Sequence, residues 1–466
     1  MRTLKITALT GLLLASGCNT LDVPDLNNPG QDELENHPTR AGVLAATTGM
    51  LFGTRLGMAD QNGYIMELGI LGRESYNLDP ADPRFVTELL VGPLDGGSNA
   101  FGGNLFAQPY ADIRGGNIVL RALAKLPASA MTTEEIEATT GFVQTIQALD
   151  FLKVITTRDD LGAPIDVDID PVAAPAPIGT KAEVYTHIVN LLDSAATHLA
   201  AGGSVFPFPL SNGFIGFDTP VNFARFNRGL RARVAIYMDD FAGALTALQG
   251  SFLNTAAPLG LGVYYVYSTT AGDQVNLLFD NSVPDTTQPR ALQAHPSILT
   301  DAQLQAGGAL DQRALDKTEV FIPPTNDLGI PTNLKFTIYQ TNLDPIPIMK
   351  NEELILLRAE ANIGLNQLGA AVTDIDLIRT TSGNLPPYSG TVDQPSLLTE
   401  LLYNKRYSLL LEGGYRWIDL RHYGLLNTLP RDLPNFKIFT RMPFPRNDCL
   451  ARNPTPQQGC ALEPGF

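Results

Sequence analysis

The sequence is poor in several features that common classes of protein require. It has one tryptophan, three cysteines and only 17% charged residues, and its formal net charge is −16. No run of lysine and arginine offsets this acidic balance, so the sequence argues against binding to nucleic acid or to an anionic membrane through a basic surface. Beyond the first residues, no segment is long and apolar enough to span a bilayer as a helix.

Motifs of familiar catalytic and cofactor sites are also missing. The chain has no G-x-S-x-G, no phosphate-binding loop and no H-E-x-x-H, and Gly260 and Gly262 lack the third glycine of a dinucleotide fingerprint. We therefore predict that the protein is not an enzyme and needs neither a cofactor nor a metal. A glycan hydrolase stays open, because sequence cannot show whether two carboxylates face each other across a cleft.

The N-terminus carries an export signal. Arg2 and Lys5 precede a short apolar stretch, 6–15, which ends in Ala-Ser-Gly before Cys18. Small residues before a cysteine are typical of a lipoprotein signal, so we predict a signal peptide over 1–17 and acylation of Cys18. The alternative is an ordinary signal peptide with a cysteine there by chance. Several acyl chains on one residue would anchor the protein stably.

The two other cysteines lie in a polar, proline-rich C-terminal segment. An exported protein meets an oxidising compartment, so we predict a disulfide between Cys449 and Cys460. The alternatives are two free thiols or a zinc site, and no histidine lies near enough in sequence to support the latter.

The rest of the chain is patterned for helices. Residues 18–36 read as an extended tether and 37–466 as one domain. Within that domain, 72–103 is a long turn-rich loop and 251–345 an irregular subdomain without a sustained helical period. A short joint at 366–369 makes its neighbouring helices a hairpin, which suggests tetratricopeptide-like stacking. Apolar spacing predicts helices at 39–53, 105–126, 133–162, 180–199, 221–238, 241–249, 350–365, 370–381, 397–411 and 416–423.

A series of short motifs follows these helices in a specific order. Tyr110-Ala-Asp-Ile with Asn117 comes first. Leu-Arg-Ala-Glu-Ala at 357–361, Asn-Lys-Arg at 404–406 and Leu-Glu-Gly-Gly-Tyr-Arg-Trp-Ile-Asp-Leu-Arg at 411–421 follow, and then Phe444-Pro445. Together with the lipoprotein cysteine, this series resembles the SusD/RagB family across nearly the whole mature chain, although 251–345 matches only in length and character.

The resemblance implies a mostly α-helical fold and a binding function. About eight scaffold helices would form tetratricopeptide-like pairs, with an irregular, loop-rich subdomain packed on them. Members of the family lie outside the outer membrane over a TonB-dependent (SusC-like) barrel transporter, and they capture glycans or in some cases peptides. We therefore expect a lipid-anchored outer-membrane protein that faces the cell exterior and delivers an oligosaccharide or peptide to such a transporter.

The same resemblance directs attention to two loop regions for the ligand. With Trp417 predicted to pack in the core, sugars would have to stack on tyrosine or phenylalanine. Arginine and asparagine side chains nearby could supply hydrogen bonds, although ordinary loop packing explains each residue as well. The candidates are Arg73, Tyr76, Asn77, Phe101, Asn104, Tyr264, Tyr265 and Tyr267.

A second function remains compatible with the same features. A lipoprotein built of helix pairs could act as a scaffold that holds other envelope proteins together. It would then have a partner other than a transporter, and it would be indifferent to small ligands.

Overall fold

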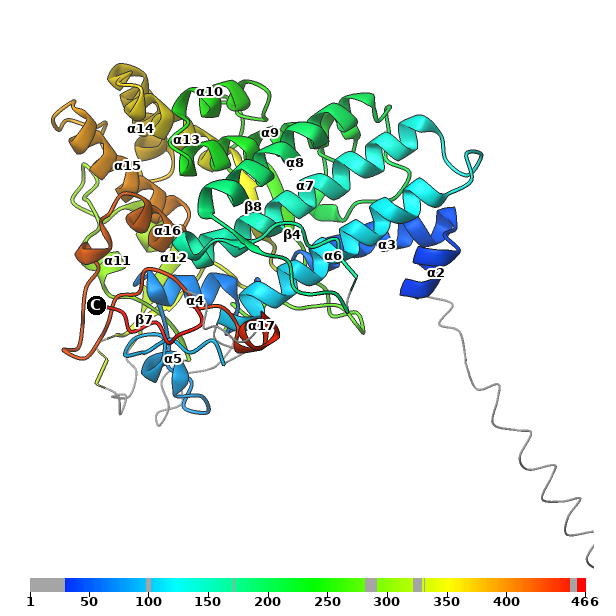
Figure 1. Ribbon diagram of the computed structural model, residues 1–466. Helices are drawn as coiled ribbons and strands as arrows, with labels where there is room; N and C mark the ends of the chain where they lie inside the picture. Colours follow the sequence, from blue (N-terminus) through cyan, green and yellow to red (C-terminus); the bar gives the residue numbers. More distant parts are fainter. Residues whose placement is uncertain are drawn as a thin grey trace, which may run out of the picture.

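A computed structural model of the chain describes residues 30–97, 102–170, 172–280, 291–321, 329–330, 332–452 and 459–466. The predicted signal peptide, Cys18, Phe101 and most of the predicted tether lie outside these residues. Figure 1 shows a helical body in which successive helices lie side by side. None of the described helices is both long and apolar enough to cross a membrane.

Eight helices form the scaffold, as the sequence predicts. Each packs on the next in the order of the chain, from blue through green to yellow in Figure 1, so that they make four consecutive pairs. The mostly α-helical, tetratricopeptide-like fold is therefore confirmed. The scaffold helices are α3 (Arg40–Gly53), α6 (Asn104–Lys125), α7 (Thr133–Arg158), α8 (Lys181–Ala201), α9 (Pro220–Tyr237), α10 (Phe241–Gln249), α13 (Asn351–Gly364) and α14 (Leu368–Thr381).

Capping side chains set where two of the longest helices begin. Thr132 accepts a hydrogen bond from the backbone N–H of Glu135, whose carboxylate accepts from the N–H of Thr132. Thr180 and Glu183 repeat this arrangement at the start of α8. Each pair satisfies backbone donors that the first turn of a helix leaves open, and a carboxylate there also suits the helix dipole.

The described residues form eight further helices outside the scaffold. They are α2 (Gln31–Asn36), α4 (Tyr64–Leu71), α5 (Arg84–Thr87), α11 (Ser297–Thr300), α12 (Gln312–Lys317), α15 (Gln394–Ser408), α16 (Tyr415–His422) and α17 (Arg446–Arg452). The turn into α16 needs glycine at 414, where φ is +65° and an added Cβ would lie 2.2 Å from the Cβ of Leu68. This requirement explains one glycine of the Gly-Gly motif.

The described strands form small two-stranded antiparallel sheets. β1 (Ser75–Asn77) pairs with β5 (Leu292–Ala294), and β2 (Ala163–Pro164) with β3 (Ile178–Gly179). β4 (Gly262–Tyr265) pairs with β8 (Ile346–Lys350), and β6 (Thr318–Val320) with β7 (Leu334–Phe336). The described part of 251–345 contains β4, β5, β6 and β7 together with the short helices α11 and α12, and it joins the scaffold where β4 pairs with β8.

The structure differs from the sequence predictions at two places near the N-terminus. The tether was predicted to stay extended to residue 36, but Gln31–Asn36 form α2, where Glu35 accepts a 2.8 Å hydrogen bond from Arg121 of α6. The sequence also gave no sign of α4. All eight residues of α4 are buried, so the helix has no polar face and therefore no amphipathic period to detect.

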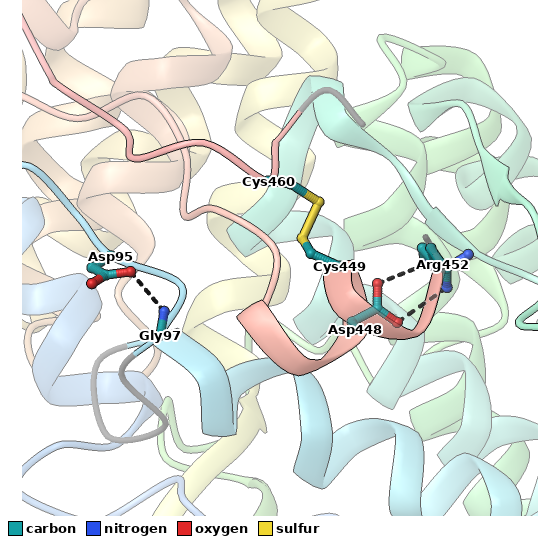
Figure 2. Close-up of a disulfide and its surroundings, with 6 residues drawn as sticks. All are labelled: Asp95, Gly97, Asp448, Cys449, Arg452 and Cys460. Atoms are coloured by element: carbon teal, nitrogen blue, oxygen red, sulfur yellow. Dashed lines mark hydrogen bonds and ion pairs between the residues drawn. A yellow bond between two sulfur atoms is a disulfide. The ribbon is translucent and has the colours of Figure 1, made fainter. Parts of the chain in front are cut away.

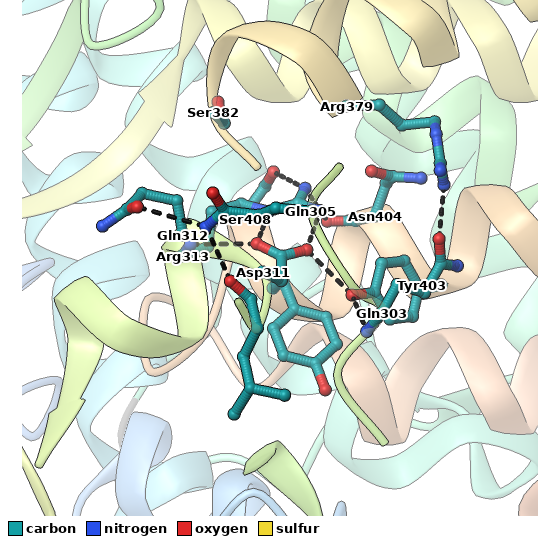
Figure 3. Close-up of polar contacts among 12 residues, drawn as sticks. Gln303, Gln305, Asp311, Gln312, Arg313, Arg379, Ser382, Tyr403, Asn404 and Ser408 are labelled. Carbon is teal, nitrogen blue, oxygen red and sulfur yellow. Dashed lines mark hydrogen bonds and ion pairs between the residues drawn. The ribbon is translucent and has the colours of Figure 1, made fainter. Parts of the chain in front are cut away.

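A hydrogen-bonded joint fastens the irregular subdomain to the end of the scaffold. Figure 3 shows side chains from the 303–313 segment and α15 meeting at Asp311, with Arg379 of α14 directed at Gln303. Asp311 accepts from Arg313 Nη2 at 2.6 Å and from the hydroxyl of Tyr403 at 2.8 Å, and Arg379 Nη1 donates to Gln303 Oε1 at 2.6 Å. Buried charges that are paired in this way hold one geometry, and removing one partner would leave the other unpaired.

The predicted disulfide joins Cys449 of α17 to Cys460. Figure 2 shows it beside the Asp95–Gly97 turn. The segment after Cys460 pairs with two others, because Leu94 and Glu463 exchange backbone hydrogen bonds, as do Ile438 and Phe466. The disulfide therefore fixes a C-terminal segment that holds two otherwise separate stretches of chain together.

Trp417 lies in the core, as predicted. It is 0% exposed, and the guanidinium of Arg421 lies 4.4 Å from the centre of its ring. The neighbouring Asp419 is also buried, but it pairs with Lys405 at 2.8 Å and not with an arginine of its own motif. Trp417 and Asp419 of the motif at 411–421 are therefore structural in this protein, and the tryptophan is not a platform for a ligand.

Candidate ligand-binding site

The first group of sequence-predicted ligand residues is buried and engaged by the protein itself. The guanidinium of Arg73, which is 0% exposed, donates to the carbonyl oxygens of Ile70 at 2.9 Å and Lys437 at 2.6 Å. Tyr76 donates its hydroxyl to Asp432. Arg73 is enclosed by the 430–437 segment, and Tyr76 is enclosed where β1 pairs with β5, so neither can touch a ligand in this structure.

Three other candidates also fail to gather at a common surface. Asn77 is buried, and its amide donates to the carbonyl of Gln61 at 3.3 Å. Asn104 is half-buried at the start of α6. Tyr267 is buried below Arg55, with 5.7 Å between the guanidinium and the ring centre. These residues stabilise the fold around the candidate site and do not form it.

Tyr264 and Tyr265, by contrast, line a hollow on the surface. Its volume is about 310 Å³, at the lower end of the range for small-molecule pockets. The C-terminal end of α3, the 209–214 segment and β4 enclose it. The residues that line this hollow, which we call the α3–β4 hollow, are Thr48, Leu51, Phe52, Thr54, Arg55, Pro209, Leu210, Ser211, Phe214, Tyr264, Tyr265, Val266, Asp273 and Ile348.

Aromatic rings and polar groups meet in the α3–β4 hollow. Phe52 is 37% exposed, and Tyr264 is half-buried, with its hydroxyl donating to the carbonyl of Gly260. Arg55 joins the end of α3 to the segment that follows β4. It donates to the carbonyl of Val266 and forms an ion pair with Asp273. Its guanidinium is 5.4 Å from the centre of the Phe52 ring, which holds that ring in place by a cation–π contact.

The polar groups at the rim suit a ligand rich in hydroxyls. Oδ1 of Asp273 accepts from Arg55 and from the backbone N–H of Gln274 at 2.8 Å. No hydrogen bond among the described residues uses Oδ2 of this carboxylate, so it can accept from a ligand. Ser211 and Thr48 add hydroxyl groups to the lining. An aromatic face beside a few such groups is the arrangement that fixes and orients a small polar ligand.

A buried polar cluster supports the floor of the hollow. Thr54 donates to Asp150 at 2.8 Å, and Lys153 Nζ donates to Asp150 at 2.9 Å and to the hydroxyl of Thr54 at 2.8 Å. Burial and the charge of Asp150 raise the pKa of the adjacent Asp112 well above its usual value. The neutral form of Asp112 is therefore favoured, and the end of α3 rests on this carboxyl next to an ion pair.

The lining favours binding and offers little for catalysis. Among the described residues that line the hollow, Asp273 is the one carboxylate, and Arg55 already neutralises it. Hydrolysis of a glycosidic bond ordinarily requires two carboxyl groups on either side of that bond. Within the described segments, no group of three or more His, Cys, Asp and Glu residues could hold a metal ion.

Sequence reasoning found the tyrosines of the hollow but missed Phe52 and Arg55. Both lie at or just beyond the C-terminal end of α3, far from β4 in the sequence, so the sequence does not show that they meet the tyrosines. A large aromatic residue that is off the buried face of an amphipathic helix was the available signal. Phe52 fits that description, since the buried positions of α3 are Val43, Thr47 and Met50.

Solved structures share this architecture at low sequence identity. A SusD superfamily protein from Bacteroides vulgatus matches with a TM-score of 0.66 and 16% identity over 90% of this chain and 99% of its own. B. fragilis NanU gives 0.65 and 14%, with 90% and 97% covered. A laminarin-binding SusD-like protein gives 0.62 and 16%, with 91% and 100% covered. The predicted SusD/RagB-like fold is therefore confirmed.

The comparisons with protein-family models and with curated proteins found no match. The similarity that the comparisons with solved structures show therefore lies in the arrangement of the helices.

Proposed function

We propose that this chain, which has the SusD-like fold, is a cell-surface lipoprotein that captures a glycan in the α3–β4 hollow and passes it to a TonB-dependent barrel transporter. The observation that carries the proposal is the combination of this fold with an aromatic hollow that has hydrogen-bonding groups at its rim. Similar structures are described as carbohydrate-binding, and one as laminarin-binding. An extended peptide is the second ligand class that such a surface could accept.

The lining of the hollow supports a sugar as the preferred ligand. The apolar face of a pyranose packs against an aromatic ring, and its hydroxyls need donors and acceptors at the edge of that ring. Phe52 presents an exposed face, and Asp273 presents a carboxylate acceptor in the same hollow. Arg55 is held by two contacts within the protein. Its position is therefore fixed before a ligand arrives, which lowers the entropic cost of binding.

Binding to an array of neutral oligosaccharides, followed by titration calorimetry, tests the proposal. Phe52→Ala should weaken the best ligand about two- to tenfold, because stacking on an aromatic face contributes about 0.5–1.5 kcal/mol beyond the area it covers. Tyr76→Phe is the matched control, since Tyr76 is buried away from the hollow, and it should leave the affinity unchanged. Failure of every glycan and peptide to bind would contradict the proposal and favour the envelope scaffold.

The predicted anchor and partner need a separate experiment. Affinity purification from detergent-solubilised outer membranes should recover a TonB-dependent barrel in roughly stoichiometric amount. Cys18→Ser should move the protein from the membrane fraction to the soluble fraction, because it removes the residue predicted to carry the acyl chains. Recovery with other envelope proteins and no barrel would contradict the transporter partnership.

A further inference from the structure

A second concave surface lies on the α15–α16 side of the molecule, apart from the α3–β4 hollow. It consists of two hollows of about 380 and 420 Å³ that share Arg416 and Thr428 as lining residues. We call this surface the Arg416 groove. Leu402 and Tyr403 of α15 and Leu420 and Leu425 form an apolar wall on one side. His295, Asp301 and Asp432 lie on the other.

Two guanidinium groups lie in the Arg416 groove. Arg406 is 9% exposed, donates to Asp301 at 2.8 Å and to the hydroxyl of Ser297 at 2.5 Å, and has no hydrogen-bond partner for its Nε. Arg416 is half-buried, and its Nη1 donates to the carbonyl of Arg73 at 2.9 Å. Among the described residues, no carboxylate forms an ion pair with Arg416.

The carboxylates that line the groove are already engaged by other groups. Asp301 pairs with Arg406, and Asp419 pairs with Lys405. Asp432 accepts from Tyr76 and from Nε2 of His295 at 3.0 Å. Nδ1 of His295 accepts from the backbone N–H of Ser297, so the imidazole is neutral. The positive charge of Arg416 is therefore left without a partner among these groups.

The pKa shifts of the ionisable groups around the groove agree with an unpaired positive charge on Arg416. Burial, and then repulsion from Arg406, lowers the pKa of Arg416 to about 9. Glu74 is buried behind the groove, and burial raises its pKa to about 7, so at neutral pH it supplies at most part of a counter-charge. An anion bound to Arg416 would replace repulsion between two cations with attraction.

We propose that the Arg416 groove binds the carboxylate of an acidic sugar, such as a hexuronic acid residue within an oligosaccharide. The guanidinium of Arg416 presents a planar pair of donors to a carboxylate, and the apolar wall of Leu402, Leu420 and Leu425 accommodates the face of the sugar ring. Asp301 and Asp432 lie in the same groove, and their negative charges disfavour a dianionic phosphate. A carboxylate carries a single charge and suits one uncompensated cation.

The inference extends the proposed glycan-binding function and rests on it for the class of ligand. It assigns that ligand a second contact surface, distinct from the α3–β4 hollow, which selects for acidic residues. A glycan with both neutral and acidic residues could engage the two surfaces only where its length allows, whereas a short acidic oligosaccharide needs the Arg416 groove alone.

The decisive experiment uses Thr428, an exposed residue that both halves of the groove share. Thr428→Glu places a carboxylate opposite Arg416, and Thr428→Gln is its neutral match in size. Full-length protein with each substitution is titrated with a galacturonic acid tetrasaccharide and with a neutral galactose tetrasaccharide. Thr428→Glu should weaken galacturonate binding at least tenfold, and Thr428→Gln should stay within about threefold of the unchanged protein.

Two further variants separate this inference from the proposed function. Arg416→Lys keeps the charge but loses the planar pair of donors, so galacturonate affinity should fall while salt still weakens the remaining binding. Phe52→Ala should leave galacturonate binding intact. Equal affinities of the two Thr428 variants, or no affinity for galacturonate in the unchanged protein, would overturn the inference. Binding of neutral glycans at the α3–β4 hollow is decided separately by the array and Phe52→Ala.

Discussion

Trp417 donates its indole N–H to the carbonyl oxygen of Phe439 at 2.8 Å. This bond joins α16 to a segment that has no regular secondary structure of its own, and it does so from a fully buried ring. The only tryptophan of the chain therefore helps to hold the C-terminal segment against the helices, and the structure gives it no contact with either candidate binding surface.

Trp417→Ala should lower the free energy of unfolding by about 3–5 kcal/mol, because it removes a large buried side chain and leaves the carbonyl of Phe439 without its donor. Urea denaturation followed by circular dichroism measures this, since the variant has no tryptophan fluorescence. Phe52→Ala, at a partly exposed position, should cost much less. Equal losses for the two variants would contradict the core assignment.

Lys405 is buried between two carboxylates, Glu360 at 2.9 Å and Asp419 at 2.8 Å. Lys405→Ala should cost about 3–5 kcal/mol, since it leaves buried acids without their cation. Lys335→Ala breaks the exposed pair with Glu319 and is the control; it should cost no more than about 1 kcal/mol. Thermal or urea unfolding of both variants checks the difference. A small loss at Lys405 would show that the triad contributes little to stability.

Glu74 should make stability depend on pH. Burial raises its pKa to about 7 in the folded protein, against 4.5 for an unperturbed glutamate. Between these values the folded state keeps a proton that the unfolded state has released, so the contribution of Glu74 to stability falls as pH rises from about 4.5 to 7 and is constant above. The slope is at most about 1.4 kcal/mol per pH unit for one group.

Glu74→Gln should therefore be more stable relative to the unchanged protein at pH 8 than at pH 5. Urea denaturation at several pH values measures the difference. Parallel stability curves for the two proteins would show that Glu74 does not change its protonation on folding in this range.

The disulfide should stabilise the fold by about 3 kcal/mol, because Cys449 and Cys460 close a loop with a sequence separation of 11. Removing both cysteines by substitution with serine should lower the free energy of unfolding by about that amount. Reduction of the unchanged protein should have a similar effect, and it should have none on the double variant. Loss of stability on reduction in both proteins would point to a cause other than this bond.

The sequence predicted the scaffold well because its signals are local. Helices were predicted to begin at residues 133 and 180, and the structure has α7 beginning at Thr133 and α8 at Lys181. Apolar spacing then gave the extent of most helices to within a few residues. α4 was missed because burial on every side removes the period. The two-residue and three-residue strands were missed because they are too short to show alternation.

The candidate site was predicted less well because it depends on contacts between distant segments. Arg73 and Tyr76 looked like exposed loop residues, yet Tyr76 lies opposite Gln293 in a buried strand pair and Arg73 is bound by the carbonyls of Pro430 and Lys437. Phe52 comes to Tyr264 only because the end of α3 packs near β4. The candidates could be chosen from the sequence by residue type. Which of them are exposed depends on how distant segments of the chain pair.

The order in which the helices pack has a consequence for folding. Within α6 to α10, and again in the pair α13 and α14, each scaffold helix has its main partner next to it in the chain. Such local contacts form quickly, because little loop-closure entropy must be lost first. β1, by contrast, forms only when it pairs with β5, and most of the scaffold helices lie in the sequence between Ser75 and its partner Ala294. We therefore expect the helical solenoid to form early and the segments around both binding surfaces to be ordered last.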